Sequence, residues 1–398
     1  SMGEVWIPGN HHAAALGIKD SAESGYRYIK RLSMEYGHDA AILNQAIHAP
    51  VALKYFEDRI GLKMCAIRHL PDYYYPQTED SLAEGRYLEV LPFPAATLGE
   101  WQFKTRVSPH VPYSLTHEDI FENGGLANMI NWDYSVMSER LGNDERCAGP
   151  GLAAYFVKGV LDRNIPMHTG VNVVELVVDG ARVVGLRAIK DGKDIFVKAN
   201  RGVVIAVSSY ERNPDYAKTL GHQLNPVSMV MPGIDGAHLR LAGQVGARIA
   251  RVPDVSMLGF HVPGEEQEEG VPLWRGALPF LGLPHTVLVN RAGKRFSNEA
   301  FYRSVYFALD IIDGATQTHP NFPCWAVFDS QAREKYPFGS LMPGQDMPEA
   351  MGTTADSIEA LADKIGVDVQ GLAATIATFN GYCETGDDPE FQRGTFPW

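Results

Sequence analysis

Histidines and cysteines are the first residues of this 398-residue chain to consider for chemistry. His11 and His12 are its only adjacent histidines, and they follow Pro8-Gly9-Asn10, which indicates a loop. No acidic or cysteine partner lies nearby at ligand spacing, so the sequence predicts no metal site. Four cysteines lie far apart: Cys65, Cys147, Cys324 and Cys383. Because none forms a C-x-x-C pair, zinc-ribbon and thioredoxin-like motifs are excluded and reduced thiols are expected.

Several widespread catalytic motifs are absent. The chain has no G-x-S-x-G elbow, which excludes the usual α/β-hydrolase site, and no G-x-x-x-x-G-K-[ST] phosphate loop. It also has no G-x-G-x-x-G after a strand, so no pyrophosphate-binding turn is visible. The residues by themselves predict only a soluble α/β protein.

Composition and charge narrow the class of protein further. Apolar residues make up 45% of the chain and charged residues 21%, as in globular proteins. Lys and Arg number 35 against 48 Asp and Glu, and the resulting net charge of −13 argues against a nucleic-acid partner. No apolar run approaches the roughly 18 residues that span a bilayer, and no secretory signal opens the chain. We therefore expect a cytoplasmic protein with no transmembrane segment.

The first elements expected along the chain are two helices. Asp20–Glu23 gives an acidic first turn, and apolar residues recur after it at helical spacing. A second helical pattern covers about residues 39–59. From about 69 to 149 prolines and turn residues break the pattern, and so long an irregular stretch is usually functional surface or a lid.

Strands are expected in the middle of the chain, after a helix at about residues 151–163. Three strands should form an antiparallel meander, with Asp179-Gly180 as a hairpin turn: 171–178, 182–189 and 194–198. Val203–Val207 is apolar on both faces, which is typical of a strand buried in a parallel sheet. Three more helices are expected near 235–247, 354–365 and 368–384, the last with Asp368 as its N-cap.

A series of short segments, each weak alone, runs collinearly over nearly the whole chain. They are Val5–Asn10, Asp20–Glu23, Pro71–Tyr74, Gly170–Leu176, Asp179–Gly185, Arg201–Ala206, Asn213, Asp235-Gly236, Gly246-Ala247, Val289–Glu299, Ile358–Gly366, Thr375, Phe379-Asn380, Gly386 and Arg393-Gly394. Together they resemble the FAD-dependent oxidoreductase family of 3-ketosteroid dehydrogenases, fumarate reductases and succinate dehydrogenase flavoproteins. The steroid-dehydrogenase branch fits better, because it shares Trp6–Asn10 and Pro71–Tyr73.

The resemblance implies the fold. Members of the family begin with a Rossmann strand, glycine loop and helix and end with a flavin-binding segment, whereas here the similarity starts after the first and stops at Gln392–Gly394. It implies an α/β chain: the middle portion of a Rossmann-like FAD-binding domain with an antiparallel meander, plus an α+β cap. The partial FAD-binding domain should comprise 1–64 and 130–238, an irregular cleft-side excursion 65–129, and the substrate domain 239–398. FAD is expected in the complete enzyme. This chain is expected to be a truncated part of that enzyme, to bind FAD weakly or not at all, and to be inactive by itself.

The resemblance also implies catalytic residues. Tyr73 matches an active-site tyrosine of the steroid dehydrogenases, although it could equally belong to a structural cluster of aromatic turn residues. Arg303 lies five residues after Asn298, where steroid Δ1-dehydrogenases carry a proton-accepting tyrosine and fumarate reductases a proton-donating arginine. Arginine is a poor resting base, but it can relay a proton or clamp an anion. A one-residue register change would put the phenol of Tyr302 there instead.

Further site residues follow from the resemblance. His261, with Phe260, matches a substrate-binding histidine of the fumarate branch, and an ordinary loop histidine is the alternative. Family members usually carry small glycines at the strand end occupied here by two serines. Cofactor contacts are implied for Trp6, Val173, Ala206, Ser208, Ser209 and Asp235.

The implied activity is oxidation or reduction of the carbon–carbon bond next to the carbonyl of an apolar ketone such as a steroid. The apolar segment 255–288 favours such a substrate over a small dicarboxylate, which would call for several basic groups. Two alternatives stay open: a fumarate-reductase-like enzyme acting on a small carboxylate, and a non-catalytic binding domain without flavin. The sequence leaves the oligomeric state open.

Overall fold

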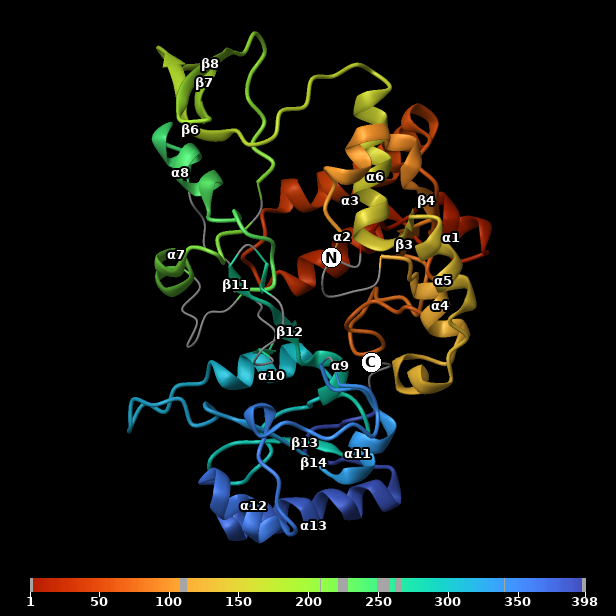
Figure 1. Cartoon of the computed structure of the whole chain (residues 1–398), viewed down its shortest axis with the longest axis vertical. Coiled ribbons are helices and arrows are strands. Elements are labelled where there is room, and N and C mark those ends of the chain that lie inside the picture. The colour runs from red at the N-terminus through yellow and green to blue at the C-terminus, as the bar shows by residue number, and fades with distance from the viewer. Residues whose placement is uncertain are drawn as a thin grey trace. The chain divides into compact units, whose positions relative to one another are not determined.

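The computed structural model describes residues 3–107, 113–207, 209–220, 228–248, 258–261, 267–268, 270–339 and 341–395. The chain divides into two compact units (Figure 1): the first comprises Ser1–Ile165 and Leu278–Trp398, and the second Pro166–Ala277. These are units of packing, so the predicted division into FAD-binding and substrate domains stays a prediction. No helix in the described ranges is both long enough and apolar enough to cross a bilayer.

The N-terminal half of the first unit is built on a three-stranded antiparallel sheet. Its central strand, β3 (Tyr87–Val90), pairs with β1 (Val5–Trp6) on one side and β2 (Met64–Ala66) on the other. Helices α2 (Ala22–Leu32) and α3 (Asp39–Ile60) confirm the two helices predicted first. The main core includes residues of this sheet, of α3 and of α6 (Ala148–Leu161): Leu53, Met64, Ala66, Leu88, Val90, Ala154 and Tyr155.

The stretch expected to be irregular contains several short elements. Besides β3, they are β4 (Phe93–Pro94), η1 (Ala95–Phe103), α4 (His117–Glu122), η2 (Leu126–Asn131), α5 (Ser135–Gly142) and β5 (Glu145–Arg146). Elements of one or two turns show no measurable apolar periodicity, which is why the sequence pattern misses them. Helix α4, for example, starts at a capping box formed by Thr116 and Asp119 rather than at an apolar stripe.

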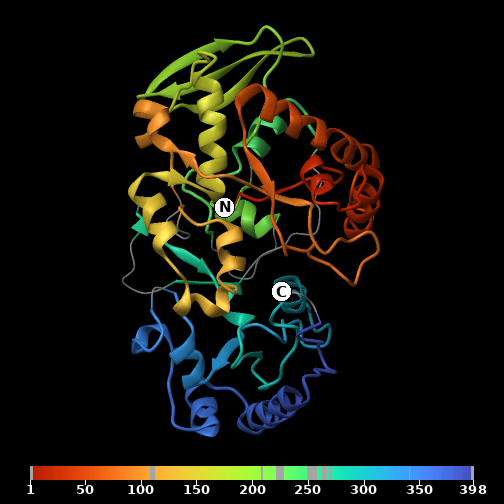
Figure 2. The ribbon, with the colours of Figure 1, turned by 90° about the vertical axis from the view of Figure 1, so that its right-hand side faces the viewer.

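The C-terminal half of the first unit is a two-stranded sheet covered by helices. Strand β13 (Thr286–Val289) pairs antiparallel with β14 (Trp325–Phe328), and its side chains pack with those of α12 (Ile358–Ile365) and α13 (Val369–Thr385). Figure 2 shows these two helices side by side in blue. The shorter helices of this half are α9 (Leu278–Leu281), α10 (Tyr302–Leu309), α11 (Ser330–Lys335) and η3 (Glu349–Met351).

Two local features tie the motif at residues 289–299 to α13. Asp368 caps the helix as predicted, because its carboxylate accepts a hydrogen bond from the Gly371 amide at 2.6 Å. Gly293 has a φ of +69°, and a Cβ there would lie 2.3 Å from the Leu372 amide nitrogen. Glycine is therefore required where this turn approaches the helix.

The second unit contains the predicted meander. Strands β6 (Asn172–Asp179), β7 (Arg182–Lys190) and β8 (Lys193–Lys198) pair antiparallel in that order. Helix α8 (Ala237–Gln244) lies beside β6, to which Arg240 and Gln244 donate hydrogen bonds. The remaining elements are α7 (Pro214–Thr219) and two strand pairs, β9 (Gly259–His261) with β12 (Trp274–Gly276) and β10 (Gln267–Glu268) with β11 (Val271–Pro272).

One predicted strand is wrong. Val203–Val207 forms no strand, and the side chain of Val204 is 91% exposed. A buried strand needs neighbours on both sides to satisfy its amides and carbonyls, and within the described residues no strand pairs with this segment. Apart from that strand, the fold is the expected mixture of helices and small sheets.

Candidate functional site

Arg86 joins three of the motifs noted in the sequence. Its side chain is completely buried and donates hydrogen bonds to Asp20 at 2.7 and 2.9 Å and to Asp72 at 2.8 Å. The rings of Trp6 and Tyr28 flank the guanidinium at 5.3 and 5.5 Å. No motif marks Arg86 in the sequence. The only sign in the sequence was that Asp20 and Asp72, each in one of the segments shared with the family, had no identified basic partner.

Asp72 fixes the loop that carries Tyr73. Besides Arg86, its carboxylate accepts hydrogen bonds from the indole of Trp6 at 2.7 Å and from the Leu82 amide at 2.8 Å. Burial raises the pKa of Asp72, and the charge of Arg86 opposes that rise. The backbone immediately before Tyr73 is therefore held by a fully bonded, buried carboxylate.

A cluster of phenols and one guanidinium brings together the three predicted catalytic residues. The rings of Tyr73 and Tyr302 meet edge to face at 5.8 Å. The guanidinium of Arg303 lies 5.7 Å from the ring centres of both Tyr74 and Tyr302. Tyr87 also contacts Tyr73, with ring centres 6.0 Å apart. We call Tyr73, Tyr74, Tyr302 and Arg303 the phenol–arginine cluster.

The start of α10 sets the positions of Tyr302 and Arg303, its first two residues. Just before it, Arg295 is buried and bonds to Glu299 at 2.7 and 2.9 Å and to Asp388 at 2.7 and 3.2 Å. The side chain of Asn298 accepts a hydrogen bond from the Ala300 amide at 3.1 Å. The charged residues of the segment Val289–Glu299 therefore fix the turn that leads into α10.

Arg303 is a half-buried cation with no counter-charge among the described residues. Among the described residues its charge and hydrogen-bond partners are phenols and no carboxylate, and its buried Nε has no hydrogen-bond partner there. Burial lowers the pKa of Arg303, but electrostatic attraction to the phenols of Tyr302 and Tyr74, together with hydrogen bonds to them, outweighs that effect and raises the pKa. Burial, reinforced by Tyr302, raises the pKa of Tyr73 to about 12. The cluster thus offers a permanent positive charge beside neutral phenols, and it can hold an anionic oxygen and donate protons.

A buried ion network lies in the same unit. His117 Nε2 is 2.9 Å from Glu4, and its Nδ1 is 3.0 Å from Glu89, which is itself buried. Burial lowers the pKa of His117, but these two carboxylates outweigh it and raise the pKa to about 9. His117 is therefore a cation at neutral pH. No sequence motif surrounds His117, so the sequence did not indicate its ion pairs with Glu4 and Glu89.

The predicted substrate residues His261 and Phe260 belong to the second unit. Both lie on β9, where Phe260 pairs with Arg275 and His261 with Trp274. The Nδ1 of His261 lies 3.0 Å from the carbonyl of Leu273. One ring nitrogen is thus engaged with the backbone, which fits the alternative of a structural histidine, and the substrate role stays a prediction.

The predicted cofactor residues occupy varied settings. Val173 lies in β6, and Ala206 is exposed in the segment Val203–Val207, which forms no strand. Asp235 accepts a hydrogen bond from the Ala237 amide at the start of α8. Ser209 has a φ of +60° and donates to Glu211 at 2.8 Å. Ser208 lies outside the described residues, and Trp6 serves the Arg86 network. Their contacts with FAD stay predictions.

The fit of these residues to FAD differs between the two ends of the cofactor. One G-x-G pair, Gly149 and Gly151, opens α6. A Cβ on Gly151 would lie 2.3 Å from the Arg146 carbonyl oxygen, so this glycine serves packing of the chain on itself. No pyrophosphate cradle is seen among the described residues, whereas the phenol–arginine cluster fits the substrate side of flavin chemistry.

Comparison with known proteins decides the family. The profile of the FAD binding domain family matches residues 1–397. The chain belongs to this family. It is 26% identical over 402 residues to a 4-oxocyclohexanecarboxylate 2-dehydrogenase of Sinomonas cyclohexanicum, covering 99% of this chain and 68% of that protein. It is also 26% identical over 424 residues to a 3-oxosteroid 1-dehydrogenase of Mycolicibacterium smegmatis, covering 99% and 72%.

The fold matches a solved member of the family. A 3-ketosteroid Δ1-dehydrogenase of Sterolibacterium denitrificans, solved with 1,4-androstadiene-3,17-dione, superposes with a TM-score of 0.86 at 28% identity, covering 100% of this chain and 74% of that one. The predicted family, the FAD cofactor and the class of FAD-dependent oxidoreductase are thereby confirmed. An NADH:fumarate oxidoreductase of Klebsiella pneumoniae, 25% identical over 70% of this chain and 27% of that protein, represents the other branch.

Proposed function

We propose that this flavoprotein acts on the carbon–carbon bond next to the carbonyl of an apolar ketone, with Arg303, Tyr302 and Tyr73 on the substrate side. The observation that carries the proposal is the half-buried guanidinium of Arg303, whose Nε is buried without a hydrogen-bond partner and which has no carboxylate partner among the described residues. A cation desolvated in this way is ready to bind an oxyanion.

The cluster suits the chemistry at the carbon next to a carbonyl. Bound FAD supplies the hydride acceptor or donor. When a proton leaves or joins the carbon beside a carbonyl, negative charge gathers on the carbonyl oxygen, where Arg303 can stabilise it. The phenol of Tyr302 lies beside the guanidinium, and the phenol of Tyr73 lies beside Tyr302. Either phenol can therefore carry the proton that the substrate carbon gains or loses. The pKa of about 12 keeps Tyr73 protonated at neutral pH, so that at rest it can donate a proton but cannot accept one.

The surroundings of the cluster suit an apolar substrate. Tyr74 packs edge to face on Phe301 at 5.4 Å, and Tyr87 packs on Tyr73, so aromatic rings flank the polar atoms. The relatives named above include an oxosteroid and an oxocyclohexane carboxylate dehydrogenase. A cytoplasmic enzyme acting on a small ketone, with no nucleic-acid partner, is also consistent with the net charge of −13.

A small carboxylate is the second candidate substrate. Two properties of Arg303 favour it. A guanidinium can bind a carboxylate through two parallel hydrogen bonds, and Arg303 follows Asn298 at the spacing of the proton-donating arginine of fumarate reductases. The phenol–arginine cluster, however, offers a single guanidinium, whereas a dicarboxylate requires more than one cation.

The test is turnover by the chain in the presence of excess FAD. Reduction of cyclohex-2-enone and of fumarate would be followed with dithionite-reduced FAD as the hydride donor, and dehydrogenation of 4-androstene-3,17-dione with oxidised FAD as the hydride acceptor. The ketone proposal predicts activity on at least one of the two ketones that exceeds any activity on fumarate. Activity on fumarate alone would support the second candidate and overturn the first.

A further inference from the structure

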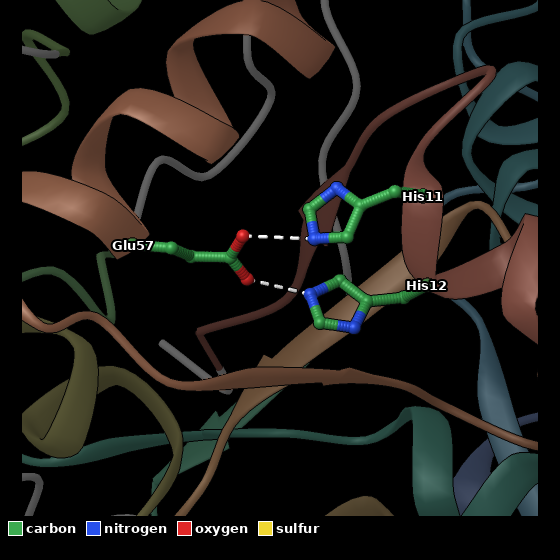
Figure 3. A group of neighbouring side chains, drawn as sticks. All are labelled: His11, His12 and Glu57. Carbon is green, nitrogen blue, oxygen red and sulfur yellow. Dashed lines mark hydrogen bonds and ion pairs between the residues drawn. The ribbon is translucent and has the colours of Figure 1, made fainter.

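A separate cluster of ligand-type side chains lies between two helices of the first unit. His11 and His12 begin α1 (His11–Ala15), and both imidazoles point at the carboxylate of Glu57 on α3 (Figure 3). The Nε2 of His11 is 2.8 Å from Oε2 of Glu57, and the Nε2 of His12 is 2.6 Å from Oε1. The three ligand atoms lie within 4.8 Å of one another.

Glu57 supplies the acidic partner that the sequence did not show for His11 and His12. The sequence predicted no metal site because no acidic residue lies near the pair at ligand spacing. The fold supplies that residue from the far end of α3, 45 positions after His12. Such a partner is brought in by tertiary packing, so local spacing could not reveal it.

The histidine side of the cluster is held in place before any ligand arrives. Asn10, buried and immediately before the pair, donates hydrogen bonds to the carbonyls of Ile7 at 2.7 Å and Gly85 at 2.9 Å. Its side-chain oxygen accepts from the Ala13 amide at 2.8 Å and caps α1. Glu57 lies on a 22-residue helix. Donors on two fixed elements lose little conformational freedom when they bind a common ion.

We propose that His11, His12 and Glu57 bind one divalent first-row transition metal ion, with Zn²⁺ as the reference ion. Two imidazoles and a carboxylate are a donor set that suits Zn²⁺, Cu²⁺ and Ni²⁺, whereas Mg²⁺ and Ca²⁺ prefer oxygen donors alone. Metal–ligand bonds of about 2.0–2.2 Å place tetrahedral ligands about 3.3 Å apart. The contacts of 2.8 and 2.6 Å therefore need to open by about 0.5 and 0.7 Å, which small side-chain rotations provide.

The exposure of the three side chains suits an ion that enters from solvent. Side-chain exposure is 45% for His11, 24% for His12 and 15% for Glu57. The carboxylate is thus the inner ligand and His11 the outer one, and the remaining coordination positions would be filled by water. Bound there, the ion would link α1 to α3 and stabilise the N-terminal half of the first unit. This role is independent of the flavin reaction.

Calorimetric titration of the chelator-treated chain with ZnCl₂ tests the proposal. We expect one ion per chain, and at least a tenfold loss of affinity in His11→Ala, His12→Ala and Glu57→Gln. The matched controls are His48→Ala and Asp58→Asn, whose side chains are exposed on the same helix α3 outside the cluster. These should bind Zn²⁺ as the wild type does, and MgCl₂ should give no binding at this site.

Two further readouts separate metal binding from a merely hydrogen-bonded cluster. Zn²⁺ should raise the unfolding temperature of the wild type but not that of His11→Ala, a variant at an exposed position that should fold normally. Co²⁺ should give visible absorption bands that are lost in the same variant. Absence of stoichiometric Zn²⁺ binding, or binding that survives all three ligand substitutions, would overturn the proposal and leave two imidazoles bonded to a carboxylate.

Discussion

Two buried arginines of the first unit, Arg86 and Arg295, differ from the half-buried Arg303 in what neutralises them. Arg86 bonds to two aspartates, and Arg295 bonds to a glutamate and an aspartate. Arg303 has only phenols beside it among the described residues. The first two are therefore structural ion pairs, whereas Arg303 retains the capacity to attract an anion. Its position in the sequence pointed to a catalytic role by resemblance, but only the fold shows that no carboxylate in the described part of the chain pairs with its charge.

Substitution at Arg303 should affect turnover far more than substitution at its neighbour. Arg303→Lys keeps the charge but loses the planar guanidinium, so kcat should fall by about 10²-fold or more. Tyr302→Phe should cost much less. Steady-state kinetics with excess FAD and a ketone substrate would measure both, with exposed Arg291→Lys as the control. If Tyr302→Phe abolished turnover while Arg303→Lys left it intact, the phenol would be the principal proton-transfer group.

His117 should make stability depend on pH. Its folded-state pKa of about 9 lies above the ordinary value of 6.5, so protonated His117 stabilises the fold fully below pH 6.5. That contribution is lost as the pH rises through 9. We expect the unfolding temperature to fall by roughly 2–4 °C over this range.

The His117→Gln variant provides the comparison for this pH effect. It should be less stable than the wild type at pH 6.5, and its unfolding temperature should change less between pH 6.5 and 9. His168→Gln, at an exposed position, is the control. An unfolding temperature whose pH dependence is the same in wild type and His117→Gln would show that the ion network with Glu4 and Glu89 does not hold the proton.

At the scale of elements, the sequence predicts what local pattern can specify. The hairpin turn Asp179-Gly180, the alternating strands around it and the N-cap Asp368 all depend on neighbours in the chain, and all three are formed. Val203–Val207 failed because burial of an apolar strand depends on partners elsewhere in the fold. The Arg86 network and Glu57 were missed for the same reason, since each joins residues from distant segments.

Loss of Arg86 should unfold this arrangement of elements. Arg86→Met would leave Asp20 and Asp72 buried without a counter-charge, which costs about 3–5 kcal/mol of unfolding free energy. Arg27→Met, which removes an exposed guanidinium bonded to Asp80, should cost much less. Urea unfolding followed by circular dichroism would compare the two. Equal, small losses in both variants would contradict the role given to Arg86.

At the scale of the whole molecule, the chain spans 68–74% of the lengths of the three dehydrogenases named above, and the sequence given contains no G-x-G-x-x-G turn. The N–H groups of such a turn and the helix after it normally bind the pyrophosphate. We therefore expect this chain to bind FAD weakly. Titration followed by flavin fluorescence measures it, and tight, stoichiometric binding would show that another segment binds the pyrophosphate.

The central claim is that Arg303 binds an oxyanion, and it can be measured without flavin. 4-Nitrophenol is an aromatic mimic of an enol, and the yellow absorbance of its anion reports ionisation directly. On binding to the wild-type chain its pKa should fall by at least about one unit, because the cation favours the anionic form. Arg303→Met should abolish this shift, and Arg291→Met should not. A bound nitrophenol that titrates as it does in water, or a shift that persists in Arg303→Met, would contradict the claim.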